Sequence, residues 1–292
     1  MSFTIITDTS ANLPTPYLKS EGIQAIPFSY YIDGKEFTCT DTETFNCREY
    51  YELIKGGMRV TTSQITPQKY IETFSPILEE GSDILFVSMS SGISGSYSSA
   101  ETARKELQRK YPQRKIHLID SLGASLGEGL VVLKAAEYRK NGMSVDETAE
   151  FLLNYRKNIY QVFTVDDLMH LRRGGRLSNA SAIVGTILNI KPLLKGNEEG
   201  KIVTIGKVKG RKSVIEKLAE KYDTLVKNPE KQTVGIAHAN SYEDAELLAK
   251  LLKRNNPPRE IIIAEYEPVT GSYLGPDALA LFFESTEDVR LK

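Results

Sequence analysis

The sequence predicts an α/β protein of two domains, with a mostly parallel sheet in the first half and an α+β arrangement in the second. Up to about residue 160, short apolar runs alternate with helical periodicity, which is typical of strands joined by crossover helices. Beyond that point a hairpin pattern is followed by helices and strands in mixed order. The chain has 292 residues, 40% of them hydrophobic, so it is long enough to bury the core that two domains need.

Alternating strand and helix patterns make up the first half. Runs of β-branched and aromatic residues predict buried strands over 3–7, 24–28, 84–87 and 116–119. Apolar residues at three- and four-residue spacing predict helices over 44–55, 67–79, 96–110 and 127–140. Ser144 and Glu147 form a capping-box pattern at the start of a helix over 144–158, and a strand over 159–165 follows. This alternation predicts helices on both faces of the sheet.

The second half shows a different order of elements. We expect a short helix over 166–175, a hairpin of strands 190–194 and 201–208, a helix over 211–226, and then a strand, a helix and a strand over 233–237, 242–254 and 260–265. The expected boundary divides the chain into an N-terminal α/β domain, residues 1–160, and a C-terminal α+β domain, residues 161–292. The two domains could exchange segments, for example near residues 60–80.

The composition argues against some classes of binding partner, namely nucleic acids and membranes. Lys plus Arg (37) nearly balances Asp plus Glu (38), so no strong overall field favours a nucleic acid. No apolar run approaches the roughly 18 residues of a membrane span, and the first residues lack a secretory pattern. Cys39 and Cys47, the two cysteines, do not suggest a disulfide framework. We therefore expect a cytoplasmic protein without nucleic acid partners or stable membrane insertion.

A serine-rich turn is the first candidate site. Residues 88–100 hold seven serines and two glycines directly after the 84–87 strand. In open α/β sheets, ligands bind beyond the carboxyl ends of strands, where the next helix offers free N–H groups and a positive dipole end. Gly92 and Gly95 would allow a close backbone approach, and hydroxyls such as that of Ser94 can donate to a carboxylate or phosphate. Alternatively, these residues only cap a helix and form a turn.

Several motifs in one order carry a resemblance to a known family. They are Thr7-Asp8-Thr9-Ser10, Thr62-Ser63-Gln64, the run 90–97, Asp120-Ser121, Asp167-Leu168, Gly174-Gly175-Arg176-Leu177-Ser178, Ile190-Lys191-Pro192 and Gly275-Pro276. Together they resemble the DegV family. The match runs nearly end to end, and spaced motifs in one order are far more specific than any single motif.

The resemblance implies a DegV-like fold with a long-chain fatty acid bound between the two domains. Such bacterial lipid-binding proteins act in fatty acid metabolism or lipid transport, have no catalysis of their own and can present the acid to a separate fatty acid kinase subunit. The carboxylate would then lie at a Ser/Thr-rich site. By motif, the binding residues are Thr62, Ser63, Ser94, Gly95, Arg176 and Tyr273. Lys209 would contact the kinase partner, and neither a metal nor a cofactor is implied.

Two positions depart from the family pattern. Tyr273 stands where the family usually has histidine, and a phenol can donate a hydrogen bond but does not become cationic near neutral pH. Lys209 stands where kinase-coupled relatives usually have arginine, which replaces a bidentate fork by a point charge. Both changes bear more on kinase coupling than on lipid binding, because the acyl tail supplies most of the affinity. Residues expected to line the tail or to form ordinary core are Ile26, Phe28, Ile183, Ile187 and Leu281.

An alternative interpretation is an enzyme or a binder that acts on another small anionic metabolite in the same cleft. Ser94 does not lie in a hydrolase motif, because Gly92 and Ser96 flank it in place of the two glycines of Gly-x-Ser-x-Gly. His117, His170 and His238 show no metal-ligand spacing. No catalytic residue is therefore predicted.

Overall fold

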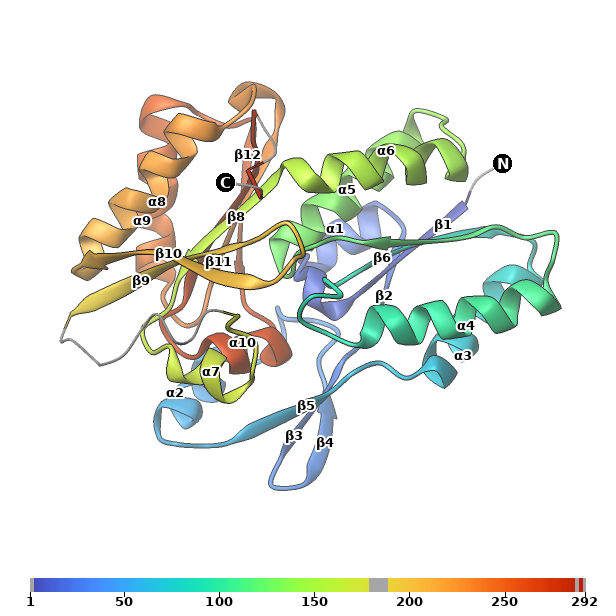
Figure 1. Ribbon diagram of the computed structural model, residues 1–292, viewed down its shortest axis with the longest axis horizontal. Coiled ribbons are helices and arrows are strands. Elements are labelled where there is room, and N and C mark those ends of the chain that lie inside the picture. The colour runs from blue at the N-terminus through green and yellow to red at the C-terminus, as the bar shows by residue number, and fades with distance from the viewer. Residues whose placement is uncertain (1–2, 179–188, 287–288, 291–292) are drawn as a thin grey trace.

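The computed structural model describes residues 3–178, 189–286 and 289–290, which contain three sheets (Figure 1). A four-stranded sheet has the order β2-β1-β6-β7, a six-stranded sheet has the order β10-β9-β8-β13-β11-β12, and a three-stranded sheet has the order β4-β3-β5. The predicted α/β class is confirmed. No helix in the described ranges is long and apolar enough to cross a membrane.

The four-stranded sheet is parallel throughout, as the sequence predicts. Its strands are β1 (Phe3–Asp8), β2 (Ile23–Ile26), β6 (Asp83–Ser88) and β7 (Ile116–Asp120). Helices α3 (Pro67–Glu79) and α4 (Ser96–Lys110) cover one face, and α5 (Leu126–Lys140) and α6 (Val145–Asn158) cover the other (Figure 1). The predicted capping box is present at α6, where the Ser144 hydroxyl accepts from the Glu147 N–H and the Glu147 carboxylate accepts from the Ser144 N–H.

The six-stranded sheet is mixed. Its strands are β8 (Ile159–Thr164), β9 (Ile190–Gly196), β10 (Ile202–Lys209), β11 (Thr233–His238), β12 (Glu260–Glu265) and β13 (Leu279–Glu284). Strands β9 and β10 form the predicted hairpin, and β11 and β12 pair in parallel. Helices α8 (Arg211–Leu225) and α9 (Tyr242–Asn255) pack on this sheet. Strand β13 was not predicted, yet it lies between β8 and β11.

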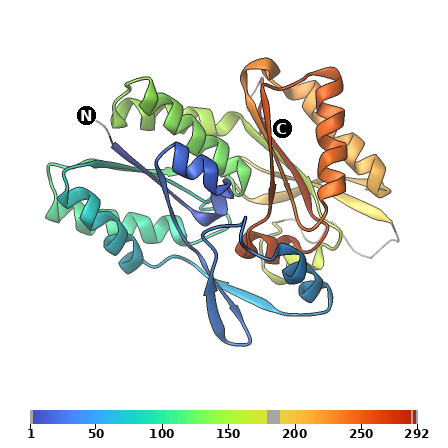
Figure 2. The same cartoon turned by 180° about the vertical axis from the view of Figure 1, so that it is seen from behind.

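The third sheet is a small antiparallel extension that the sequence did not predict (Figure 2). Its strands are β3 (Ser29–Ile32), β4 (Lys35–Thr38) and β5 (Val60–Ser63). Beside it lie α2 (Cys47–Lys55) and α10 (Pro268–Leu274), and α7 (Met169–Arg173) packs on α10. Helix α2 begins three residues later than predicted because the Asn46 side chain caps it by accepting from the Glu49 N–H at 3.2 Å. The remaining short helices are α1 (Thr15–Ser20), η1 (Thr9–Ala11) and η3 (Pro229–Lys231).

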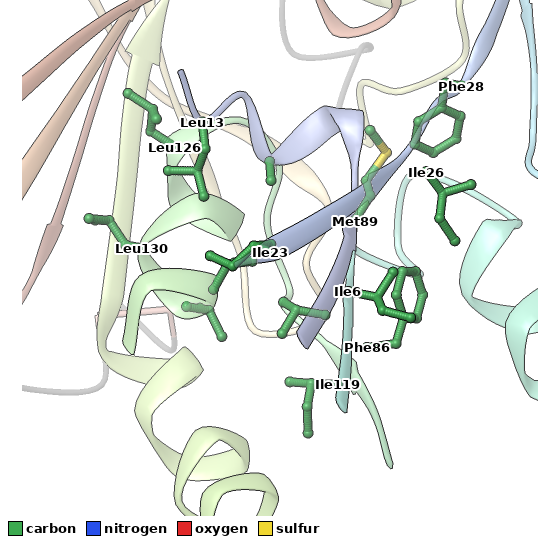
Figure 3. Packing of buried hydrophobic residues seen from close by; sticks show 14 of the residues in the cluster. Ile6, Leu13, Ile23, Ile26, Phe28, Phe86, Met89, Ile119, Leu126 and Leu130 are labelled. Atoms are coloured by element: carbon green, nitrogen blue, oxygen red, sulfur yellow. The ribbon is translucent and has the colours of Figure 1, made fainter. Parts of the chain in front are cut away.

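Helix α5 lies between the two large sheets and joins them. It contacts β1 and β6 of the parallel sheet as well as β8, β11 and β13 of the mixed sheet. Its buried residues run around the helix from Leu126 to Ala136, as expected for a helix with protein on all sides. Figure 3 shows Leu126 of α5 next to Leu13 and Leu130 one turn further along the helix; all three belong to one buried cluster that also includes residues of the mixed sheet.

Candidate functional site

A cavity of about 310 Å³ lies where elements of all three sheets meet. Its volume is at the lower end of the range of about 300–1,000 Å³ that small-molecule sites occupy. Most of its wall is apolar, formed by Phe28, Met89, Ile93, Leu122, Phe163, Leu171, Ile202, Tyr266, Val269, Leu274 and Phe282. The six binding residues expected from the family motifs, which are Thr62, Ser63, Ser94, Gly95, Arg176 and Tyr273, all line this one cavity.

Thr62 and Tyr273 form a hydroxyl pair at the cavity wall. Thr62 comes from β5 and Tyr273 from the last turn of α10, and the Thr62 Oγ1 lies 2.6 Å from the Tyr273 hydroxyl oxygen. One of these hydroxyls donates to the other, so the proton of the accepting hydroxyl stays free to donate elsewhere. The pair can therefore offer a hydrogen bond to an acceptor in the cavity.

Arg176 places a cation beside this pair. Its guanidinium carbon lies 4.7 Å from the centroid of the Tyr273 ring. The Arg176 Nε donates to the Ile93 carbonyl at 3.1 Å, and Nη1 donates to the Gly174 carbonyl. Gly174 makes room for the ring, because a Cβ there would come within 2.3 Å of the Tyr273 Cδ1. Stacking and two backbone acceptors thus fix a positive charge at the same wall.

Ser94 and Gly95 bring the start of α4 to the cavity. The Ser94 hydroxyl donates to the Ser96 Oγ at 3.1 Å and accepts from the Ser96 N–H at 3.2 Å. Gly95 is the N-cap of α4 and makes no side-chain cap, and a Cβ there would come within 2.0 Å of the Gln64 Oε1. Because the N-terminus of α4 lies at the cavity, the positive end of its helix dipole and the Arg176 guanidinium both favour an anion there. Gly92 does not line this cavity, and a Cβ there would meet the Glu199 carbonyl of the β9–β10 turn at 2.4 Å.

The structure places three of the other expected residues, Lys209, Ile26 and Leu281, away from this cavity. Lys209 is exposed at the end of β10 and does not line it. Phe28 lines the cavity, but Ile26 and Leu281 do not, because both are buried in the packed cores of their sheets. Ile183 and Ile187 lie outside the described residues.

Ser125 is a cavity residue that the sequence reasoning missed. It follows β7 and caps α5, and it is 1% exposed with φ 54° and ψ −147°. Among the described residues its Oγ has no hydrogen-bond partner. A signal was present in the sequence, because Gly123-Ala-Ser125-Leu-Gly127 has the Gly-x-Ser-x-Gly spacing between a strand and a helix.

Comparisons with known proteins identify the family of this chain. A family model described as "Uncharacterised protein, DegV family" matches residues 2–286. This chain belongs to the DegV family. A DegV domain-containing protein from Clostridium perfringens is 36% identical over 281 residues, which cover 96% of this chain and 97% of the relative.

Solved DegV structures share the fold. A Thermus thermophilus DegV family protein described by its fatty acid binding has a TM-score of 0.88 at 27% identity, covering 98% of this chain and 100% of that one. A Ruminococcus gnavus DegV family protein, described with vaccenic acid, has a TM-score of 0.86 at 27% identity, covering 97% of this chain and 99% of that one. The predicted DegV family and DegV-like α/β fold are therefore confirmed.

The DegV motif at Thr7–Ser10 builds a buried acidic cluster rather than the cavity wall. The Ser10 hydroxyl lies 2.6 Å from the Asp8 Oδ1 and 2.5 Å from the Glu128 Oε2, although it has one proton to donate. Burial raises the pKa of Asp8 to about 6 and the pKa of Glu128 well above its usual range. Burial thus favours the protonated form of the Glu128 carboxyl. Asp8 also accepts from the Met89 N–H at 3.0 Å, which ties the cluster to a cavity residue.

The three histidines of this DegV chain lie in its described part, and none of them lines the cavity. His117 Nε2 lies 2.7 Å from the Asp146 Oδ1 near the surface, and His238 Nδ1 lies 3.3 Å from the Glu265 Oε2. Burial lowers the pKa of His170 and lowers that of His238 to about 4, so neither is cationic near neutral pH. Within the described ranges, no group of three acidic, histidine or cysteine residues could hold a metal ion.

Proposed function

We propose that this chain binds a long-chain fatty acid in the cavity. The carboxylate lies against the hydroxyls of Thr62, Ser94 and Tyr273 with the Arg176 guanidinium beside them, and Ser63 and Gly95 complete this end. The observation that carries the proposal is one cavity that combines a cation and a hydroxyl pair with a largely apolar wall. The fatty acid binding described for solved DegV relatives supports it.

The binding free energies expected for the acyl tail and for the carboxylate indicate different roles for these two parts of the ligand. Each buried methylene is worth about 0.8 kcal/mol, so a tail of about fifteen carbons supplies roughly 12 kcal/mol before the costs of binding. A hydrogen bond to a charged group adds about 1.5 to 3 kcal/mol. The tail therefore dominates the affinity, and the polar end fixes the orientation.

We further propose that the chain has no catalysis of its own and either presents the acid to a separate fatty acid kinase subunit or serves lipid transport. Lys209 is exposed on β10, where a partner can reach it. In this arrangement residues 1–160 and 161–292 act as two domains with the ligand between them. Acyl phosphate should form after a kinase subunit and ATP are added, and turnover without that subunit would contradict the carrier role.

Lipid extraction tests the binding function directly. Protein purified from cells is extracted with organic solvent, and the extract is analysed by mass spectrometry. We expect close to one equivalent of long-chain fatty acid, and much less from a Thr62→Val, Ser94→Ala double variant prepared in parallel. An extract that holds no fatty acid, or a small anionic metabolite in its place, contradicts the proposal.

A further inference from the structure

Ser125 presents a buried hydroxyl that the head-group site does not use. It is 1% exposed and lines the cavity, and its Oγ has no hydrogen-bond partner within the described part of the chain. Folded proteins seldom leave a buried hydroxyl without a partner, because it has lost its bonds to water. A ligand group that reaches Ser125 would restore that bond.

The surroundings hold Ser125 in a conformation that is almost reserved for glycine. Gly123 and Gly127 flank it, and the Gln161 side chain packs against both. A Cβ would lie 2.2 Å from the Gln161 Nε2 at Gly123 and 2.6 Å from the Gln161 Cδ at Gly127. This packing keeps the turn tight and holds the Ser125 hydroxyl in place at the cavity wall.

Two more hydroxyls line the same cavity. Tyr266 precedes α10 and lines the cavity, and its phenol is close enough to Ser125 for that hydroxyl to oppose the rise in phenol pKa that burial causes. The two do not meet hydrogen-bond geometry, since the Ser125 Oγ has no partner. Thr270, in the first turn of α10, also lines the cavity; its Oγ1 meets hydrogen-bond geometry with none of the described residues, but it is close enough to the Glu267 carboxylate to oppose the rise in pKa that burial causes in that group.

Within this second group of hydroxyls, Ser125 and Tyr266 are separated from the head-group site along α10, whereas Thr270 lies about one helical turn before Tyr273. Tyr273 lies near the end of the helix and Tyr266 lies just before its start. Tyr266 precedes Tyr273 by seven positions, and at about 1.5 Å per position their backbones lie on the order of 10 Å apart. A fatty acid held by its carboxylate at Tyr273 would therefore meet Ser125 part-way along its tail.

The Ser125 hydroxyl can form a hydrogen bond with a ligand, but among the described residues no base lies beside it to activate it as a nucleophile. In α/β-hydrolases a serine in such a strand-to-helix turn is the nucleophile, and a histidine takes its proton. Here no histidine lines the cavity. Burial raises the pKa of Tyr266, so the phenol stays protonated and cannot act as the base.

We propose that Ser125, together with Tyr266 and Thr270, forms a second polar site that accepts an oxygen substituent on the acyl chain, so that the ligands include mid-chain hydroxy or keto fatty acids. This inference rests on the proposed fatty acid binding. A chain hydroxyl at Ser125 can donate and accept. The same hydroxyl placed against Phe163 or Phe282 would lose water and gain no partner.

The test compares stearate with a series of monohydroxystearates that differ in the position of the hydroxyl. Affinities for delipidated protein are measured by calorimetry. We expect hydroxyls within a narrow range of positions to bind at least as tightly as stearate, and hydroxyls elsewhere to bind more weakly. Ser125→Ala, which keeps the Cβ, should weaken the favoured isomers roughly 2- to 12-fold and leave stearate unchanged or tighter. Thr62→Val is the matched control, because it should weaken every acid by a similar factor and preserve the ratio between isomers.

Three outcomes overturn the inference. In the first, every hydroxystearate binds more weakly than stearate to the unsubstituted protein. In the second, Ser125→Ala lowers the affinity of all acids equally, which indicates a structural role. In the third, an acyl p-nitrophenyl ester is hydrolysed in a way that Ser125→Ala abolishes, which makes Ser125 a nucleophile. Failure to bind stearate itself is a different result and refutes the proposed function.

Discussion

Replacing Thr62 by valine separates the contributions of the carboxylate and the tail to fatty acid affinity. Valine keeps the shape of threonine but removes the hydroxyl that lies 2.6 Å from the Tyr273 hydroxyl. A hydrogen bond to a charged group is worth about 1.5 to 3 kcal/mol, which corresponds to roughly 10- to 150-fold in Kd. We expect the lower part of this range, about 10- to 30-fold, because the Tyr273 hydroxyl is then released to bind the carboxylate.

Measuring Kd for saturated fatty acids of increasing length separates the contribution of the tail from that of the carboxylate. Each added methylene should tighten Kd about 4-fold until the cavity is full. A plot of the logarithm of Kd against carbon number should therefore be linear for the unsubstituted protein and for Thr62→Val. The two lines should be parallel, because the substitution changes the head-group contact alone.

Thr61→Val is the matched control. Thr61 precedes Thr62 on β5, is exposed and does not line the cavity. Its line should coincide with that of the unsubstituted protein. Coincidence of the Thr62→Val line as well, or a slope that changes with the substitution, would refute this placement of the carboxylate.

Three further substitutions have definite expected outcomes. Glu128 keeps a proton in the folded state that the unfolded chain releases above its ordinary pKa of 4.5, so stability should fall as the pH rises above that value, by up to about 1.4 kcal/mol per pH unit. Urea unfolding from pH 5 to 8 should show a smaller fall in the free energy of unfolding for Glu128→Gln than for the exposed control Glu137→Gln, and parallel profiles would contradict the raised pKa of Glu128. Gly123→Ala should lower the melting temperature in calorimetry by several degrees, because its Cβ would clash with Gln161, and an unchanged value would contradict that close packing. Arg176→Gln should weaken palmitate binding by roughly 10-fold in titrations at low salt and less at high salt, and a salt-independent loss would indicate that its charge is not involved.

The first half of the fold could be predicted because buried parallel strands appear in sequence as continuous apolar runs. The runs at 84–87 and 116–119 became β6 and β7 for this reason. Strand β4 gave no such signal, because all four of its residues are exposed. Helix α10 contains Gly271, which disfavours helix, but Gly271 leaves room for the Tyr51 hydroxyl, and a Cβ there would approach it to 1.9 Å. Such a tertiary contact has no local sequence signature.

The candidate site could be predicted in part for a similar reason. Thr62, Ser94, Arg176 and Tyr273 come from four distant segments, so no spacing rule connects them, and only the family motifs indicated that they belong together. Ser125 did carry a local pattern. Its meaning depended on burial, on the backbone conformation and on the missing hydrogen-bond partner, which only three-dimensional structure reveals.

The central position of β13 has a consequence for synthesis on the ribosome. Strands β8, β9 and β10 emerge first, and β11 and β12 follow, but β13 separates the two groups in the finished sheet. Residues 279–284 leave the exit tunnel after the other strands of this sheet. Until then, the strand group β8–β10 and the strand group β11–β12 cannot pair through β13, and their edges stay exposed. Nascent chains arrested with β12 outside the exit tunnel and β13 still inside it should therefore remain sensitive to protease within β8–β12, and emergence of β13 should give protection in one late step.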